Sequence, residues 1–512
     1  MFTGPDSAWG WLVVRAVRSG QRESTNRDLI GARLDSLGVI ALYGLALAAA
    51  AALGLLVSDL YVVGIGALTL APLASHARHV GIKRVLSEPT VITVIVWFYV
   101  GVFPLRGLAV AISHEQDLIF LRGPISSNDL VSMLLLAAAC TTLLIEAYYL
   151  ACPGRLAQPS VATSPSDRHQ AVVRLASLLT VLCLGGLSGV ILEHGGIAGA
   201  RASFVQHTVT AALQGNSSLF DSAWQLFAVP AAWCCAYVVL NIGSSRLTRQ
   251  AFAVAGTLII AGAIGIYSSR LNTILGLMGM WVVYFYSGRR LPARLILLAL
   301  PLAILASKPI LDTRAGVTVS ARVTPLERYS RIAGYGVLDV ALAIRSRPEE
   351  IRSQLTSLDR WLALPEYLVP AKLWPGRPNI NSRRLVLYAA QDVGSVNDKA
   401  TGLPATYIIE WWLIGGWAGA LTASVLLGFV MGLAVRKLTR RRPSPAAVLV
   451  LAFLMTVGWG YYDTGDAVTT IVGQARAAAY LAFLLWATGV IGDPWFRTKS
   501  VAPLSREHDS SH

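Results

Sequence analysis

The sequence is a succession of long apolar stretches, and this feature restricts the fold more than any other. A helix of about 20 apolar residues crosses a hydrocarbon core about 30 Å thick. Mean hydropathy is +0.57 and only 14% of the residues are charged, which excludes a soluble enzyme. We therefore predict an all-α integral membrane protein with about twelve transmembrane helices. The predicted spans lie near 37–57, 60–75, 91–110, 130–151, 173–192, 223–242, 250–268, 271–287, 292–307, 415–436, 445–462 and 471–491.

Basic residues alternate between the two sides of this arrangement. With both termini placed in the cytoplasm, the inside segments hold 23 of the 43 Lys and Arg residues, counted with Arg294 and Arg436 at the inner ends of two spans. The short outside loops hold only Arg122, Arg201 and Arg270. Three more lie within spans, and the remaining 14 lie in one long external segment. This bias agrees with the positive-inside rule. The predicted parts are a cytoplasmic arm (1–36), spans one to nine (37–307), a large external loop (308–404), spans ten to twelve (405–491) and a cytoplasmic tail (492–512).

The sequence lacks a typical signal peptide, metal-site cysteines and nucleotide- or nucleic-acid-binding motifs. The first 36 residues are polar and Arg-rich, so we interpret the first apolar run as a retained anchor and not as a cleaved signal peptide. The five cysteines lack metal-site spacing and are expected to pack as apolar side chains. No nucleotide-binding or nucleic-acid-binding motif accompanies the net charge of +15. We expect no nucleic-acid partner. The 37 Arg against 6 Lys indicate a GC-rich bacterial genome.

The external loop is large enough to contain structure of its own. It combines helical patterns, such as "PLERYSRIAGYGVLDVALAI" and "PEEIRSQLTSLDRWLALP", with the Pro/Gly-punctuated stretch "VPAKLWPGRPNINSRR". Its 14 basic residues exceed its 9 acidic residues, which leaves a net charge of +5. Guanidinium groups bind phosphate oxygens in pairs, so this surface is suited to an anionic partner. The alternative is an ordinary solvated surface that is rich in Arg only because the genome is GC-rich.

Isolated ionisable residues near the spans are candidates for a site. Arg106 follows Pro104 at the outer end of the third span, Arg270 is the only charge in a tight external hairpin, and Arg201 is the lone basic residue of its loop. Such residues often face a cavity, although Arg106 can instead snorkel to the interface. Glu146, near the cytoplasmic end of the fourth span, is expected to reach the interface in that way.

Two carboxylates on the external side are further candidates. Glu410 stands before the tenth span, beside two tryptophans in "YIIEWWLIGG". A carboxylate buried among aromatic rings needs a partner such as an Arg or a sugar hydroxyl. Asp463 lies in the last external loop, where carboxylates are also common without any function.

Four features in order give the chain a resemblance to a known family. They are "SSRLNTILGLMG", the late external loop, "LVPAKLWPGRPNI" within it, and "ATYIIEWWLIGGWAGALTASVLLGFVMG" after it. With these motifs the chain resembles the bacterial oligosaccharide repeat-unit polymerases, the Wzy or O-antigen polymerase family. Arg377 stands where the family more often has Lys. The matching positions are Pro370, Lys372, Trp374, Pro375, Arg377 and Pro378, followed by Glu410, Gly415 and Gly416.

The resemblance implies a GT-C-like glycosyltransferase of the bacterial inner membrane. Its substrates would be oligosaccharides on undecaprenyl pyrophosphate, joined on the external face without a metal or cofactor, with a flippase and a chain-length regulator as further partners. Glu410 would take the proton of the acceptor hydroxyl, with Asp463 as the second choice, and Arg270 would assist at the reacting bond. The expected pyrophosphate and glycan ligands are Arg106, Arg201, Arg314, Arg377, Arg383, Arg384 and Trp374.

Three alternatives remain open from the sequence. An O-antigen ligase would use a His in the large loop, but 308–404 contains none. Another GT-C enzyme would need acidic residues in the first external loop, which offers only Ser58 and Asp59. A transporter or flippase of lipid-linked glycans would show charges along several spans and internal repeats.

Overall fold

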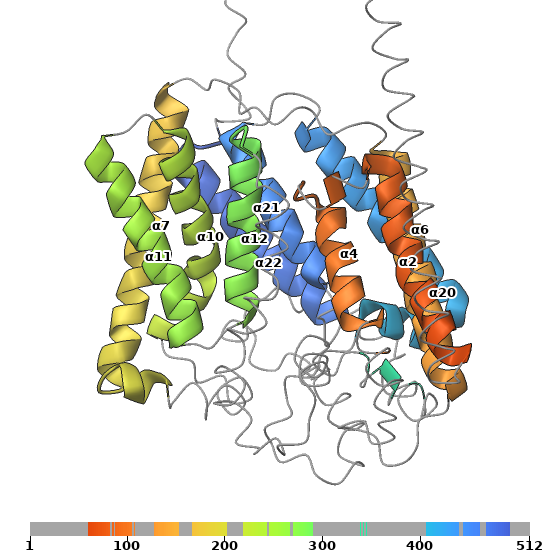
Figure 1. Cartoon of the computed structure of the whole chain (residues 1–512). Helices are drawn as coiled ribbons and strands as arrows, with labels where there is room; N and C mark the ends of the chain where they lie inside the picture. The colour runs from red at the N-terminus through yellow and green to blue at the C-terminus, as the bar shows by residue number, and fades with distance from the viewer. Residues whose placement is uncertain are drawn as a thin grey trace, which may run out of the picture.

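The computed structural model describes five stretches of the bundle and four residues of the long loop. The stretches are 60–107, 127–152, 166–201, 219–289 and 406–491, with gaps at 82–83, 86–87, 105–106, 243–244, 267–269, 440–443 and 461–466. The loop residues are Leu338, Ala341, Leu342 and Arg345. Ten helices and no strand occur in this described part (Figure 1). They are α2 (Leu60–Val80), α4 (Val91–Val102), α6 (Ser127–Ala151), α7 (Ser166–Glu193), α10 (Leu219–Asn241), α11 (Arg246–Gly265), α12 (Arg270–Tyr286), α20 (Tyr407–Thr439), α21 (Pro445–Gly460) and α22 (Ala467–Ala487).

Each of these helices falls on one of the ranges expected to span a membrane. The two remaining expected spans, 37–57 and 292–307, lie outside the described residues. Four of the described helices are long and apolar enough to cross a membrane, namely Asp129–Ala151, His169–Glu193, Arg246–Gly265 and Tyr407–Thr439. The chain is thus an all-α membrane protein.

The helices form two groups that α21 joins. In Figure 1, α7, α10, α11 and α12 lie on one side, and α2, α4, α6 and α20 lie on the other. Helix α21 contacts α12 in the first group and both α4 and α20 in the second. A continuous cluster of buried apolar side chains runs through both groups.

Contacts between helices settle their relative directions. Arg436 near the end of α20 donates to the carbonyl oxygen of Ala151 at the end of α6, at 3.5 Å, so these two helices are parallel. Asn241 of α10 donates to Ser287, just after α12, at 2.7 Å, so these are parallel as well. By contrast, Gly189 near the end of α7 lies against the start of α10, so that pair is antiparallel.

Helices α6 and α20 approach each other closely through small residues. Ala420, Ser424, Gly428 and Gly432 recur at every fourth position of α20. A Cβ atom at Gly428 would overlap the carbonyl oxygen of Leu144, and one at Gly432 would overlap that of Tyr148. Such contacts between small residues are typical of helices that associate in a membrane, where packing replaces the hydrophobic effect.

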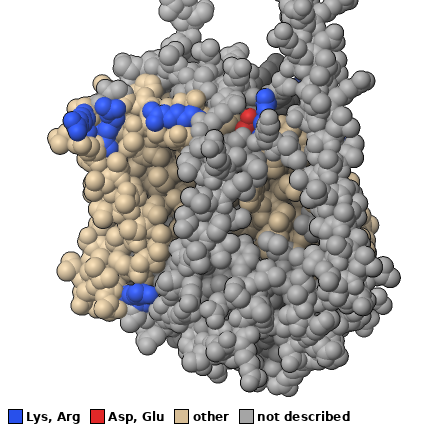
Figure 2. All heavy atoms as spheres, viewed as in Figure 1, with Lys and Arg blue, Asp and Glu red and all other residues tan. Residues whose placement is uncertain are grey.

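The outer surface of the bundle is apolar along its middle and basic at one end. Large apolar side chains of α7 and α11, including Val181, Val254 and Leu258, are exposed, as expected for contact with lipid. Figure 2 shows this uncharged belt between blue patches along the upper edge and one at the lower edge. Of the ten Lys and Arg side chains that are described, eight lie in or near the helix ends that Figure 1 places at the upper edge, which we call the basic end. They are Arg78, Arg84, Arg174, Arg246, Arg249, Arg289, Arg436 and Lys437.

The opposite end is the loop end. Arg201, which follows the C-terminal end of α7, and Arg345 of the long loop are the two described basic side chains there. This segregation follows the alternation of basic residues in the sequence.

Candidate functional site

A kink in α20 produces a separate short helix at the loop end. Gly415 and Gly416 depart from helical geometry, with φ/ψ of −132°/20° and 60°/−151°. The conformation of Gly416 is accessible essentially to glycine alone. The residues before the kink, 407–414, therefore form a short helix that we call the Glu410 segment. In Figure 1 this segment lies at the lower end of the bundle, where the long part of α20 begins.

The Glu410 segment is capped and packed. The Thr406 hydroxyl accepts a hydrogen bond from the backbone N–H of Ile409 at 3.1 Å, which satisfies one of the free donors at the helix start. The side chains of Ile408, Ile409 and Leu413 are fully buried. Glu410 itself is only 5% exposed and interacts with its surroundings. The sequence therefore places a buried carboxylate at the loop end of a membrane bundle.

The described residues of the long loop dock at this same end. Leu338, Ala341, Leu342 and Arg345 are all helical and follow the spacing i, i+3, i+4 and i+7, which puts them on one face. The first three are buried and belong to the apolar cluster of the bundle. This apolar face anchors the loop, and Arg345 follows it one turn later.

Arg345 connects the loop to two helices of the bundle. Its Nε atom donates to Asp129 Oδ1, in the first turn of α6, at 3.3 Å. Its guanidinium carbon lies 5.2 Å from the centre of the Trp412 ring, a cation–π contact. Its Nη1 atom is buried and has no hydrogen-bond partner among the described residues. We call Asp129, Arg345 and Trp412, together with Glu410 two positions before Trp412 on the same short helix, the loop junction. The contacts join Arg345 to Asp129 and Trp412, and Glu410 belongs to the group by its position on that helix.

The loop junction combines groups that suit a polar or anionic ligand. A buried guanidinium nitrogen without a partner is costly unless a ligand supplies an acceptor. Glu410 can take a proton from a hydroxyl group at hydrogen-bond distance. Within the described stretches, no three His, Cys, Asp or Glu residues are grouped as metal ligands.

The residues expected from the sequence are only partly visible. Glu410 lies in the loop junction, and Arg201 is exposed at the loop end. Arg270 is the first residue of α12, but its side chain is outside the described part. The other expected site residues lie outside the described residues. They are Arg106, Arg314, Trp374, Arg377, Arg383, Arg384 and Asp463.

Asp129, Arg345 and Trp412 of the loop junction were not among the site residues expected from the sequence. Trp412 was noted only as a neighbour of Glu410. Arg345 had a usable signal, because it continues the helical spacing of Leu338, Ala341 and Leu342. Asp129 had none, since an acidic residue near a helix start is common.

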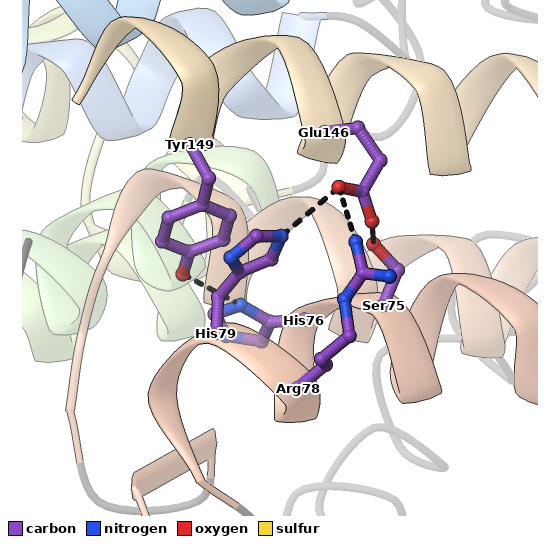
Figure 3. A network of polar contacts seen from close by, with 6 residues as sticks. All are labelled: Ser75, His76, Arg78, His79, Glu146 and Tyr149. Carbon is purple, nitrogen blue, oxygen red and sulfur yellow. Dashed lines mark hydrogen bonds and ion pairs between the residues drawn. The ribbon is translucent and has the colours of Figure 1, made fainter. Parts of the chain in front are cut away.

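A second polar cluster lies at the basic end, between α2 and α6 (Figure 3). Glu146 accepts three hydrogen bonds there. They come from Ser75 Oγ at 2.7 Å, from Arg78 Nη2 at 2.6 Å and from His79 Nε2 at 3.0 Å. Glu146 is thus an ion-paired residue in a network, and its side chain is about one-third exposed.

The hydrogen bonds in the other half of this network have a definite direction. The Thr93 hydroxyl donates its single proton to the carbonyl oxygen of Glu88 at 2.8 Å. It must therefore accept from His76 Nε2, which lies 3.1 Å away. The remaining nitrogen, Nδ1, then accepts from the Tyr149 hydroxyl at 2.9 Å. Every side chain drawn in Figure 3 has a partner, so this cluster ties helices together.

The chain matches no known family model, no curated protein and no solved structure. The loop junction is therefore the candidate site on two observations: an incompletely bonded guanidinium lies over the Trp412 ring, and the short helix that carries this ring also carries the buried Glu410.

Proposed function

We propose that the protein is a GT-C-like membrane glycosyltransferase with twelve spans and both termini in the cytoplasm. It joins oligosaccharide repeat units carried on undecaprenyl pyrophosphate, at the external face of a bacterial inner membrane. One observation carries the proposal: the long loop delivers a guanidinium to the helix that bears a buried carboxylate, through Arg345 on Trp412, two residues after Glu410.

The reaction needs a base and a stabilised leaving group. The acceptor hydroxyl oxygen attacks the anomeric carbon of the donor, and its proton passes to the Glu410 carboxylate. The bond between that carbon and the pyrophosphate oxygen breaks, and its electron pair leaves with undecaprenyl pyrophosphate. A fixed guanidinium stabilises the charge that develops on that oxygen. Arg345 supplies one such group, and its buried Nη1 supplies the donor.

The distribution of charge supports the orientation. Eight of the ten described basic side chains lie at the end opposite the loop, which favours that end as cytoplasmic. Lipid-linked repeat units are joined on the external side, where the proposal puts the loop end. The remaining ligands that we expect there are Arg106, Arg201, Arg270, Arg314, Arg377, Arg383, Arg384 and Trp374, with Asp463 as a second carboxylate.

The test compares two carboxylates at the loop end. Glu410→Gln removes the buried base and should lower the rate of glycan extension at least about a hundredfold. Glu193→Gln, at the exposed end of α7, serves as the matched control and should leave the rate unchanged. The measurement is the length of glycan made by purified protein in liposomes from lipid-linked repeat units isolated from a deletion strain.

The deletion strain also separates the alternatives. Single repeat units on lipid at the external face agree with a polymerase. Long polymer that stays on its lipid carrier indicates a ligase, and repeat units retained at the cytoplasmic face indicate a flippase. Normal extension by Glu410→Gln would overturn the assignment of the base.

A further inference from the structure

We propose that Asp129 is a positioning residue for the loop junction. It holds Nε of Arg345, so that the guanidinium stays over Trp412 and its Nη1 atom stays on the buried side. The kinetic part of this inference rests on the proposed function, whereas the geometric part is independent of it.

The backbone of the loop is held by apolar contacts that do not orient the arginine. Leu338, Ala341 and Leu342 are buried in the apolar cluster, so the segment is fixed next to the bundle. The side chain of Arg345 still has several rotatable bonds, whose freedom must be lost before the guanidinium points in one direction. Only polar or ring contacts at its end can select that direction.

Two contacts at different parts of the guanidinium make this selection. Asp129 accepts from Nε at 3.3 Å, which holds one edge of the planar group. Trp412 holds its face at 5.2 Å. With one edge and one face restrained, the direction of Nη1 is determined. The Arg345 side chain is 17% exposed, whereas that of Asp129 is 45% exposed, so the ion pair closes the junction on its solvent side.

The contact also joins distant parts of the chain. Asp129 and Arg345 are 216 residues apart, and the pair ties the first turn of α6 to the long loop. Because α6 packs along α20, the same contact keeps the loop in register with the Glu410 segment. Asp129 thus acts on the site through Arg345 and not by touching the substrate.

The kinetic test separates positioning from binding. Asp129→Asn should lower kcat about fivefold with KM nearly unchanged, because half-exposed ion pairs are weak and Arg345 remains present. Arg345→Gln should lower kcat about a hundredfold, because the donor itself is lost. Asp129→Glu should restore most of the rate, and Glu193→Gln remains the control for a lost carboxylate at the loop end.

The geometric test needs no activity. The variant Asp129→Cys with Arg345→Cys should form a cross-link with a short bis-maleimide, detected by mass spectrometry of the joined peptides. The five native cysteines are buried, which keeps the background low. The pair Ile197→Cys with Arg345→Cys is the control, because Ile197 follows α7 in the other helix group.

The outcomes distinguish the two proposals. Absence of the 129–345 cross-link overturns the docking of the loop. If the wild type extends glycan normally and Asp129→Asn has the same kcat and KM, the positioning role of Asp129 is overturned and the proposed function is not. A wild type without extension activity overturns the proposed function. In that case the positioning role is tested by a double-mutant cycle of Asp129→Asn and Arg345→Gln, measured by thermal unfolding. A coupling free energy of zero between the two substitutions would show that Asp129 does not hold Arg345.

Discussion

Polar side chains in the described part differ in how completely they are bonded. Glu146 accepts three hydrogen bonds, and His76 uses both ring nitrogens. Arg345, by comparison, leaves Nη1 without a partner in the described residues. Satisfied groups hold structure together, whereas a buried donor without an acceptor costs free energy that a ligand can recover. Other buried polar atoms of the described part also lack a hydrogen bond, but Arg345 Nη1 is the one that belongs to a guanidinium. This difference favours the loop junction as the site and the cluster of Figure 3, the α2–α6 network, as a structural tie.

The α2–α6 network makes a prediction about stability. Glu146→Gln keeps the shape of the side chain but removes its charge, and its amide nitrogen cannot accept from Arg78, His79 or Ser75. We expect it to lower the free energy of unfolding by about 1 kcal/mol, a discounted value because the carboxylate is partly solvated. The measurement is the temperature at which protein purified in detergent loses its monodisperse peak.

A matched substitution isolates the buried part of that effect. Arg78→Ala removes only one donor, and its side chain is 64% exposed. Its effect should be clearly smaller than that of Glu146→Gln, while glycan extension stays normal in both variants. Equal losses in the two variants would mean that Ser75 and His79 contribute nothing to the network.

At the scale of elements, the kink in α20 makes a second prediction. Gly416 adopts φ 60° and ψ −151°, which no residue with a side chain adopts without strain. Gly416→Ala should lower stability by about 1–3 kcal/mol or straighten the helix, and either result displaces the Glu410 segment. Extension of glycan should fall together with stability, as measured by the liposome assay and by thermal unfolding.

The neighbouring glycine provides the control for the kink. Gly415 has φ −132° and ψ 20°, which other residues adopt, and no atom lies within 4 Å of the place where its Cβ would be. Gly415→Ala should therefore be tolerated. If both alanine variants behaved alike, the positive φ of Gly416 would not be what holds the segment in place.

Hydropathy predicted the location of the helices well and their first and last residues less well. All ten described helices fall on expected spans, because apolar content marks the part of a helix that crosses lipid. Helix ends depend on caps instead: α11 begins at Arg246, four residues before the expected span, because Ser245 accepts from the N–H of Thr248. Likewise α20 begins at Tyr407, and the expected start at 415 corresponds to the kink.

The loop junction could be predicted only in part, because one of its contacts joins residues that are far apart in the sequence. Glu410 was recognisable because a carboxylate beside two tryptophans is locally unusual. The contact of Asp129 with Arg345 joins residues 216 positions apart, and no local pattern encodes such a pair. Tertiary packing of the loop on α6 and α20 creates it, so it becomes visible only in three dimensions.

At the scale of the whole molecule, charge is distributed along one axis. The basic end carries eight of the ten described basic side chains, the middle is apolar, and the loop end carries the loop junction. Positive charge accumulates on the cytoplasmic side of bacterial membrane proteins. The distribution therefore supports the proposed orientation, in which the basic end is cytoplasmic and the loop end is external.

This orientation can be tested with two exposed positions at opposite ends. Leu247, in the first turn of α11, lies at the basic end and is 78% exposed, and Ile197, after the end of α7, lies at the loop end and is 62% exposed. Single cysteines placed there react above background, since all five native cysteines are buried. A membrane-impermeant maleimide should label Ile197→Cys in intact spheroplasts and Leu247→Cys only after lysis. The reverse pattern would put the loop junction in the cytoplasm, where externally displayed lipid-linked glycans cannot reach it, and would overturn the proposed function together with the topology.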